Sequence, residues 1–280
     1  MRNNTTMTTS GRCCALFSAA LMVVLMLCQV SGAAAGQRPA GPVKYPGFGL
    51  GFSRVVVAEG DRSSGQVTAV NNSDNVYLVQ SRVWPADGTT GYPLTGARDD
   101  KDNNRVPVPF LVTPPLKRLE SWSTMQLRII TTPDNHLPAD RESLFFLSSK
   151  AIPSVAPVKA DPGRVTAQMS MALQSFIKLY YRPKALDQYA IFDGKVAPRL
   201  TFSRPDGGHI RVTNPTPYHI TFAVLTVGGK AVDAEKRRAM VPPLGDYDYP
   251  LPDGTTGREV KWQIIDEFGL VTNEQHMTLP

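Results

Sequence analysis

Cysteine is almost absent from this sequence. Only three cysteines occur among the 280 residues, and Cys13, Cys14 and Cys28 all lie close to the N-terminal end. The chain after residue 28 therefore has no thiol chemistry, no disulfide and no cysteine-ligated metal site. Any domain that it forms has to fold without covalent cross-links.

Motifs of the common enzyme classes are missing as well. The four histidines are scattered and form no H-x-x-x-H pair, so a zinc hydrolase has no support. No G-x-S-x-G segment is present, so a serine hydrolase has none either. The sequence predicts a protein that is not an enzyme and that needs no cofactor and no metal. The histidines are His136, His209, His219 and His276, of which the middle two could share one face of a sheet.

Sustained helical periodicity is scarce, and charge of one sign is not concentrated. The 24 prolines and 22 glycines supply many turns, which argues against a helical bundle. A hydrophobic content of 42% with 19% charged residues excludes a disordered chain. The net charge of +6 is well mixed, which predicts no nucleic-acid partner but suits an anionic one.

The first 35 residues have the organisation of a secretory signal peptide. Arg2 and Arg12 are their only charged residues, an apolar run follows over residues 15–30, and Ala33 and Ala35 provide an A-x-A cleavage site. An uncleaved membrane anchor is the alternative, but the run is short beside the roughly 20 residues of a membrane span. We therefore expect residues 1–35 to be removed and the processed protein not to be inserted in a membrane.

Short apolar segments rich in β-branched residues recur through the rest of the chain, with turn-forming residues between them. This pattern predicts an all-β fold of the sandwich or barrel type. A second series of segments begins after Pro183, so we expect two domains, over residues 36–184 and 185–280. Residues 36–51 are rich in proline and glycine and are expected to form a loose leader. The clearest strand candidates are residues 54–57, 66–70, 77–84, 125–130, 144–147, 165–181, 200–202, 209–213, 218–227 and 260–265.

The segment of residues 165–182 differs from an ordinary core strand. Its apolar residues alternate with mostly polar ones over about nine positions, which gives the strand one apolar face. The segment is long, and it carries Lys178 and Arg182 among apolar neighbours, where a lysine needs either solvent or an anion. A strand that only covers its own core is the simpler alternative. The alternating apolar residues are Val165, Ala167, Met169, Met171 and Leu173.

Five segments carry motifs that occur together in one family. Residues 172–183 read Ala-Leu-Gln-Ser-Phe-Ile-Lys-Leu-Tyr-Tyr-Arg-Pro, and residues 137–146 read Leu-Pro-Ala-Asp-Arg-Glu-Ser-Leu-Phe-Phe. Residues 112–119, 214–218 and 264–266 add three shorter motifs in the same order along the chain. Together they resemble the PapD-like periplasmic chaperones, which assemble pili by the chaperone–usher pathway. The resemblance implies two immunoglobulin-like β-sandwich domains in a boomerang arrangement.

The resemblance implies two binding sites for a pilus subunit. Arg54 and Lys178 match the pair of basic residues that anchors the C-terminal carboxylate of the subunit in the cleft between the domains. Met169, Met171 and Leu173 match the alternating residues of the donor strand, which enters the incomplete sandwich of the subunit.

A third set of residues matches the salt bridges between the two domains of the family. Glu142, Arg182 and Asp266 belong to this set, and the resemblance implies a structural role for them.

The function implied is that of a periplasmic chaperone that folds and caps pilus subunits by donor-strand complementation and delivers them to an outer-membrane usher. Its partners would be the subunits and the usher. The exposed donor strand would also allow the free chaperone to associate weakly with itself.

Some features depart from the family or stay open. Ser148 and Ser149 replace an asparagine and an apolar residue, and the connection over residues 154–163 fits neither the short-loop nor the long-loop branch. No role is assigned to residues 86–105, and the isomer of the Thr113–Pro114 peptide is left open. The alternative function is a two-sandwich adhesin that binds sugars through its tryptophans, Trp84, Trp122 and Trp262.

Overall fold

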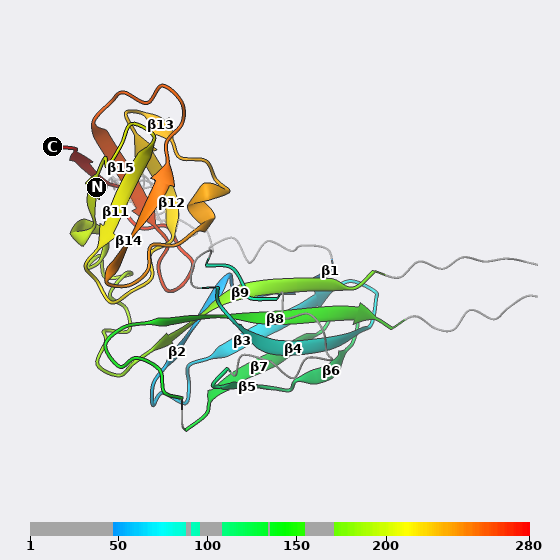
Figure 1. Ribbon diagram of the computed structural model, residues 1–280. Coiled ribbons are helices and arrows are strands. Elements are labelled where there is room, and N and C mark those ends of the chain that lie inside the picture. Colours follow the sequence, from blue (N-terminus) through cyan, green and yellow to red (C-terminus); the bar gives the residue numbers. More distant parts are fainter. Residues whose placement is uncertain (1–46, 88–90, 96–107, 134, 155–170) are drawn as a thin grey trace, which may run out of the picture. The chain divides into compact units, whose positions relative to one another are not determined.

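The computed structural model describes residues 47–87, 91–95, 108–133, 135–154 and 171–280, which all belong to one compact unit (Figure 1). Within these residues the chain is almost entirely strand and turn, with two short 3-10 helices, η1 (Ala197–Arg199) and η2 (Lys236–Arg238). The prediction of an all-β fold is therefore confirmed. No helix in this described part is long and apolar enough to cross a membrane.

The first sandwich packs a four-stranded sheet against a five-stranded sheet (Figure 1). Apolar side chains from alternate positions of both sheets form one core, because the side chains of a strand point to its two faces in turn. Val67, Leu127 and Leu179 are among its fully buried members. The four-stranded sheet has the order β1 (Gly47–Leu50), β3 (Gln66–Asn72), β7 (Thr124–Thr131) and β5 (Phe110–Thr113), and the five-stranded sheet the order β2 (Arg54–Ala58), β9 (Leu173–Arg182), β8 (Ser143–Pro153), β4 (Tyr77–Pro85) and β6 (Leu116–Leu119).

The second sandwich has a core of its own, built from the last third of the chain. Trp262 lies in this core beside Phe202, with ring centroids 4.5 Å apart, and its Nε1–H donates to the carbonyl oxygen of Ala197 at 3.1 Å. One sheet has the order β10 (Thr201–Ser203), β11 (His209–Asn214) and β14 (Gly245–Pro250), and the other the order β13 (Lys230–Ala231), β12 (Phe222–Val227), β15 (Glu259–Ile264) and β16 (Gln275–Thr278).

The pairing of β9 decides where its side chains lie. β9 runs antiparallel to β8 on one side and parallel to β2 on the other. The register places Lys178 opposite Arg54 on β2 and opposite Phe146 on β8. Residues that are far apart in the sequence therefore lie in one row across the sheet.

Several predictions of local structure need correction. Residues 47–50, expected to belong to a loose leader, form strand β1, because backbone pairing with β3 needs no large side chains and Phe48 is buried in the core. Strands β5, β6, β13, β14 and β16 were not among the predicted strands. Residues 1–46 lie outside the described part of the chain, so the signal-peptide prediction is not tested, and the domain limits at 184 and 185 and the boomerang arrangement stay predictions.

The two unexpected serines on β8 are accommodated by hydrogen bonds. Ser149 is fully buried, and its hydroxyl lies 2.9 Å from the hydroxyl of Ser81 on β4. Ser148 accepts a hydrogen bond of 2.7 Å from the Nε1–H of Trp84. Each buried hydroxyl thus has a partner, which removes most of the cost of placing it in the sheet. The Thr113–Pro114 peptide is cis.

Candidate functional site

The two predicted anchor residues are direct neighbours in the structure. Arg54 begins β2, and Lys178 lies at the paired position of β9. Both side chains are basic, and strand pairing holds them side by side although 123 residues lie between them in the sequence. Two like charges that a fold brings together in this way suit an anionic ligand.

Lys178 is half-buried and has a neutral partner. Its Nζ donates a hydrogen bond of 3.0 Å to the hydroxyl of Thr221, which directly precedes β12 of the second sandwich. Burial, and secondarily the positive charge of Arg54, lower the pKa of Lys178 from its ordinary value of 10.5 to about 7. At neutral pH the ammonium group is thus only partly protonated, and a bound anion would favour its charged form.

Arg54 is buried and its hydrogen-bonding capacity is not exhausted. Its Nη1 donates to the carbonyl oxygen of Ile265 at 3.1 Å, and its guanidinium lies 5.8 Å from the centre of the Tyr180 ring. Its Nε is buried and has no hydrogen-bond partner among the described residues. A buried donor without a partner costs free energy, and an incoming oxygen ligand would remove that cost.

A pocket of about 290 Å³ opens beside Lys178. Its lining combines three basic side chains with aromatic and aliphatic ones, and none of the described lining residues is an aspartate or a glutamate. Part of the wall comes from the stretch 86–105, to which the sequence assigned no role, of which residues 88–90 and 96–105 are not described. The lining residues are Gly91, Tyr92, Phe146, Lys178, Thr221, Phe222, Ala234, Arg237, Arg238 and Ile265.

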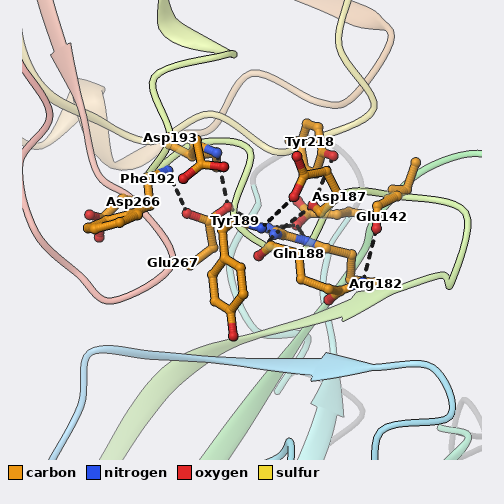
Figure 2. A network of polar contacts seen from close by, with 12 residues as sticks. Glu142, Arg182, Asp187, Gln188, Tyr189, Phe192, Asp193, Tyr218, Asp266 and Glu267 are labelled. Carbon is orange, nitrogen blue, oxygen red and sulfur yellow. Dashed lines mark hydrogen bonds and ion pairs between the residues drawn. The ribbon is translucent and has the colours of Figure 1, made fainter.

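A buried ion-pair network surrounds Arg182 at the end of β9 (Figure 2). Its Nε and Nη2 donate to Oε1 of Glu142 at 2.8 and 2.5 Å, and its Nη1 donates to Oε1 of Glu267 at 2.8 Å. The Arg182 side chain is only 1% exposed, and its guanidinium also lies 4.8 Å from the centre of the Tyr218 ring. Arg182 therefore joins residues of both sandwiches in one polar cluster, which we call the Arg182 network.

The carboxylate of Glu142 is held in its charged form. Burial by itself would raise its pKa, but the His219 ring, whose Nδ1 lies 3.4 Å from Oε2, and the positive charge of Arg182 outweigh burial and lower the pKa below its ordinary value. The backbone N–H of His219 donates to Oε2 of Glu142 at 2.8 Å. A carboxylate fixed in this way is a structural ion-pair partner and does not act as a proton donor or acceptor at neutral pH.

The prediction for Asp266 is wrong, and Glu267 takes its place. The Oδ1 of Asp266 accepts the backbone N–H groups of Phe268 and Leu270 at 2.9 and 2.8 Å, so its side chain caps the turn that follows β15. The next residue, Glu267, points to Arg182 and also accepts the backbone N–H groups of Ile191 and Phe192 at 3.1 and 2.8 Å (Figure 2). A short polar side chain favours a local turn, whereas the longer glutamate reaches the arginine.

The predicted donor residues are described in part. Met171 is 74% exposed and lies two residues before the start of β9, and Leu173, the first residue of β9, is 53% exposed. Further along the same strand the residues of the same parity, Ile177 and Leu179, are buried in the core of the first sandwich. The apolar face of β9 therefore continues beyond its own core. Met169, Val165 and Ala167 lie outside the described residues.

The tryptophans do not form a common platform for a sugar. Trp262 is buried in the second core, and Trp84 is bonded to Ser148 with the guanidinium of Arg82 3.8 Å from its ring centre. Trp122 is exposed, and its Nε1–H donates to Asp74 at 2.8 Å. Within the described residues, no group of three or more histidine, aspartate or glutamate side chains is placed to hold a metal ion.

Sequence reasoning missed Thr221, Glu267 and Arg237. Thr221 and Arg237 come from the second sandwich and reach the site only through the packing of distant elements. Their segments carry no motif of their own. Glu267 directly follows the motif of residues 264–266. Its side chain is longer than that of Asp266, and this length was the only sequence feature that could have indicated the ion pair with Arg182.

These features define a two-sandwich β protein with a basic cleft and an exposed apolar strand end. Two family models match the chain, "Pili and flagellar-assembly chaperone, PapD N-terminal domain" over residues 47–187 and "Pili assembly chaperone PapD, C-terminal domain" over residues 195–276. The chain therefore belongs to the PapD family of pilus assembly chaperones, and the resemblance predicted from its motifs is confirmed. The proteins of this family are not enzymes.

The similar proteins are named as chaperones. The chaperone protein FocC of Escherichia coli is 34% identical over 235 residues, which cover 83% of this chain and 90% of FocC. The crystal structure of the E. coli chaperone DraB has a TM-score of 0.64 and 32% identity over 83% of this chain and 98% of DraB. The SafB chaperone of Salmonella enterica, solved in complex with the SafA pilin, has a TM-score of 0.64 and 29% identity over 84% of this chain and 98% of the matched chain.

Proposed function

We propose that this chain is a periplasmic chaperone that caps pilus subunits by donor-strand complementation and hands them to an outer-membrane usher. The observation that carries the proposal is that the apolar face of β9 leaves its own core, with Leu173 at the start of the strand and Met171 just before it both exposed. SafB, a chaperone of similar fold, was solved in complex with the SafA pilin, which supports a pilus subunit as the partner of this chain. The signal peptide expected in residues 1–35 supports export.

The apolar row supplies most of the binding free energy in this proposal. A subunit that lacks one strand exposes an apolar groove and two unpaired strand edges. The row Met169, Met171 and Leu173 fills the groove, and the strand backbone pairs with the edges. Full burial stabilises by roughly 1.5–3 kcal/mol per side chain. Methionine adapts to differently shaped grooves, so one chaperone can serve several subunits.

Arg54 and Lys178 fix the register of the subunit in this proposal. Both are charged donors in a partly dry cleft, where bonds to the C-terminal carboxylate of a subunit are strong. The Nε of Arg54, which has no partner among the described residues, and the ammonium of Lys178 are both available to that carboxylate. The Arg182 network is proposed to hold the two sandwiches in place around the anchor.

Replacing Leu173 with aspartate tests the donor strand. The charge would have to enter the apolar groove of the subunit, so we expect pilus subunits that copurify with the wild-type chain to be lost. The matched control is Leu111→Asp, since Leu111 is 62% exposed on β5 of the other sheet of the same sandwich. Copurification from the periplasm of pilus-producing cells, measured by mass spectrometry, distinguishes the two variants. Equal loss or equal retention in both variants would contradict the donor role of Leu173.

The anchor predicts a characteristic pH dependence of binding. The pKa of Lys178 without a ligand is about 7. The negative charge of a bound carboxylate raises this pKa, so binding above pH 7 is accompanied by the uptake of a proton. The affinity for a short subunit peptide with a free C-terminus should therefore be level below pH 7. Above it the affinity should fall by at most about tenfold per pH unit. Titrations by isothermal calorimetry measure this profile, and Lys178→Arg, which stays charged, should flatten it. An identical slope in both proteins would show that Lys178 does not contact the carboxylate.

A further inference from the structure

The basic residues of the structure differ in how their charge is balanced. Arg182 is opposed by the carboxylates of Glu142 and Glu267. Around the pocket, in contrast, the hydrogen-bond partners that the described residues provide for Arg54, Lys178 and Arg237 are neutral carbonyl or hydroxyl oxygens. Three basic residues, two at the pocket (Lys178 and Arg237) and one beside it (Arg54), therefore lie together, and no carboxylate of the described residues is bonded to any of them.

Arg237 is held firmly at the edge of this cleft. Its Nε donates to the carbonyl oxygen of Val232 at 3.0 Å, and its Nη1 donates to the carbonyl oxygen of Ala223 on β12. These bonds fix the guanidinium on the second sandwich, and the residue lines the same pocket as Lys178. A guanidinium that is already oriented loses little conformational freedom when it binds an anion.

One C-terminal carboxylate cannot balance the charge of this cleft. It carries a single negative charge, and Arg54 and Lys178 are sufficient to bind it. The remaining charge of Arg237 faces a pocket whose other walls are largely aromatic and aliphatic, where an unbalanced charge is costly. The pocket is also larger than a carboxylate needs, so it has room for a side chain of the ligand.

We propose that the cleft binds a second negative group, an acidic side chain among the last three residues of the pilus subunit, and that Arg237 is the residue that recognises it. This inference rests on the proposed function, since it assumes that the C-terminus of a subunit lies at Arg54 and Lys178. It assigns the chaperone a preference among subunits that depends on charge near the C-terminus.

The neighbouring Arg238 provides a matched control. It lines the same pocket, but its guanidinium is exposed and is paired with Glu235 at 3.0 Å. Its charge is therefore already balanced and screened by solvent. Arg237→Gln removes the charge while glutamine can still donate to a carbonyl oxygen, and Arg237→Lys keeps the charge.

The experiment compares dye-labelled synthetic peptides that end in a free carboxylate and carry either glutamate or glutamine at each of the last three positions. Fluorescence anisotropy measures their affinity for the full chain. At one of these positions the wild type should bind the glutamate peptide about tenfold more tightly, the equivalent of about 1.4 kcal/mol. Arg237→Gln should abolish this preference, whereas Arg238→Gln and Arg237→Lys should retain it.

The outcomes separate this inference from the proposed function. Lys178→Met should weaken the binding of both peptides of a pair and leave the preference between them. A wild type that binds glutamate and glutamine peptides equally at all three positions, or a preference that survives in Arg237→Gln, overturns the role of Arg237 and leaves the anchor intact. If wild type and Lys178→Met bind every peptide alike, the carboxylate anchor itself is wrong, and this inference fails with it. Circular dichroism checks that each variant is folded.

Discussion

Replacing Arg182 with methionine is expected to lower the free energy of unfolding by about 3–5 kcal/mol. The substitution leaves Glu142 and Glu267 buried without the cation that both carboxylates share. Their mutual repulsion and the lost solvation then act against the folded state. Urea unfolding followed by tryptophan fluorescence measures the effect as a lower midpoint at an unchanged slope.

The exposed pair between Arg211 and Asp248 is the control for this prediction. Its geometry is as good as that of the buried pairs, with two bonds of 2.8 and 2.7 Å from one guanidinium to one carboxylate. Because solvent screens it, Arg211→Met should lower the urea midpoint much less than Arg182→Met does. If the two substitutions lower the midpoint equally, the Arg182 network is not an important source of stability. The triple variant Arg182→Met, Glu142→Gln and Glu267→Gln should recover part of the loss, since it removes the unpaired charges.

Replacing Lys178 with methionine is expected to weaken subunit binding by about 2–5 kcal/mol, as the loss of one partner of a buried charge pair typically does. The same substitution should leave the free protein at least as stable as the wild type. The lowered pKa of Lys178 means that burying its charge opposes folding, and methionine has a similar length without that charge. Such a trade-off between stability and function is typical of a binding residue.

The stability of the free protein should depend on pH in a way that the variant lacks. Between the folded pKa of about 7 and the ordinary value of 10.5, the unfolded state binds more protons at Lys178 than the folded state does. Stability therefore rises with pH across this window, and below pH 7 the full cost of the buried charge is present. Thermal unfolding of both proteins at several pH values measures the difference, with Lys150→Met on β8 as a lysine control. A large loss of stability in Lys178→Met would show that the residue is structural.

Much of this architecture could be predicted because it depends on local patterns. Alternating apolar residues and turn residues located β3, β4 and β7 to within two residues and found the first part of β8 but not its end at Pro153. The motifs around Glu142 and Lys178 led to the family. Strand β1 could not be found in this way, because Gly47 and Gly49 carry no side-chain signal and only the pairing with β3 makes them a strand. Strands as short as β13, which has only two residues, cannot show an alternating pattern, and they too are recognised only from their pairing with a neighbouring strand.

The site was predictable only where one strand carries it. Lys178 and Leu173 lie on the recognised segment, whereas Arg54 lies in none of the motifs and was assigned only from the family resemblance, as a basic residue in the first predicted strand. Part of the pocket wall comes from β12, η2 and the residues just before them in the second sandwich. The sequence around Thr221 and Arg237 contains no pattern which indicates that these two residues will lie near Lys178 of β9. The two adjacent acidic residues Asp266 and Glu267 show a further limit of sequence analysis. Asp266 bonds to the backbone of its own turn and Glu267 bonds to Arg182, and the motif alone did not indicate which of the two would form the ion pair.

The internal hydrogen bonds of the two anchor residues have a consequence for the rate at which a subunit leaves. Lys178 is bonded to Thr221, and Arg54 is bonded to the carbonyl oxygen of Ile265. In the proposed mechanism a departing carboxylate is replaced by these internal partners, which are always at hand and need no diffusion. These internal bonds lower the free-energy cost of breaking the bonds to the carboxylate. The subunit can therefore dissociate from the chaperone without an external energy source. An assembly factor that must give up its cargo benefits from anchor residues that have hydrogen-bond partners within the chaperone itself.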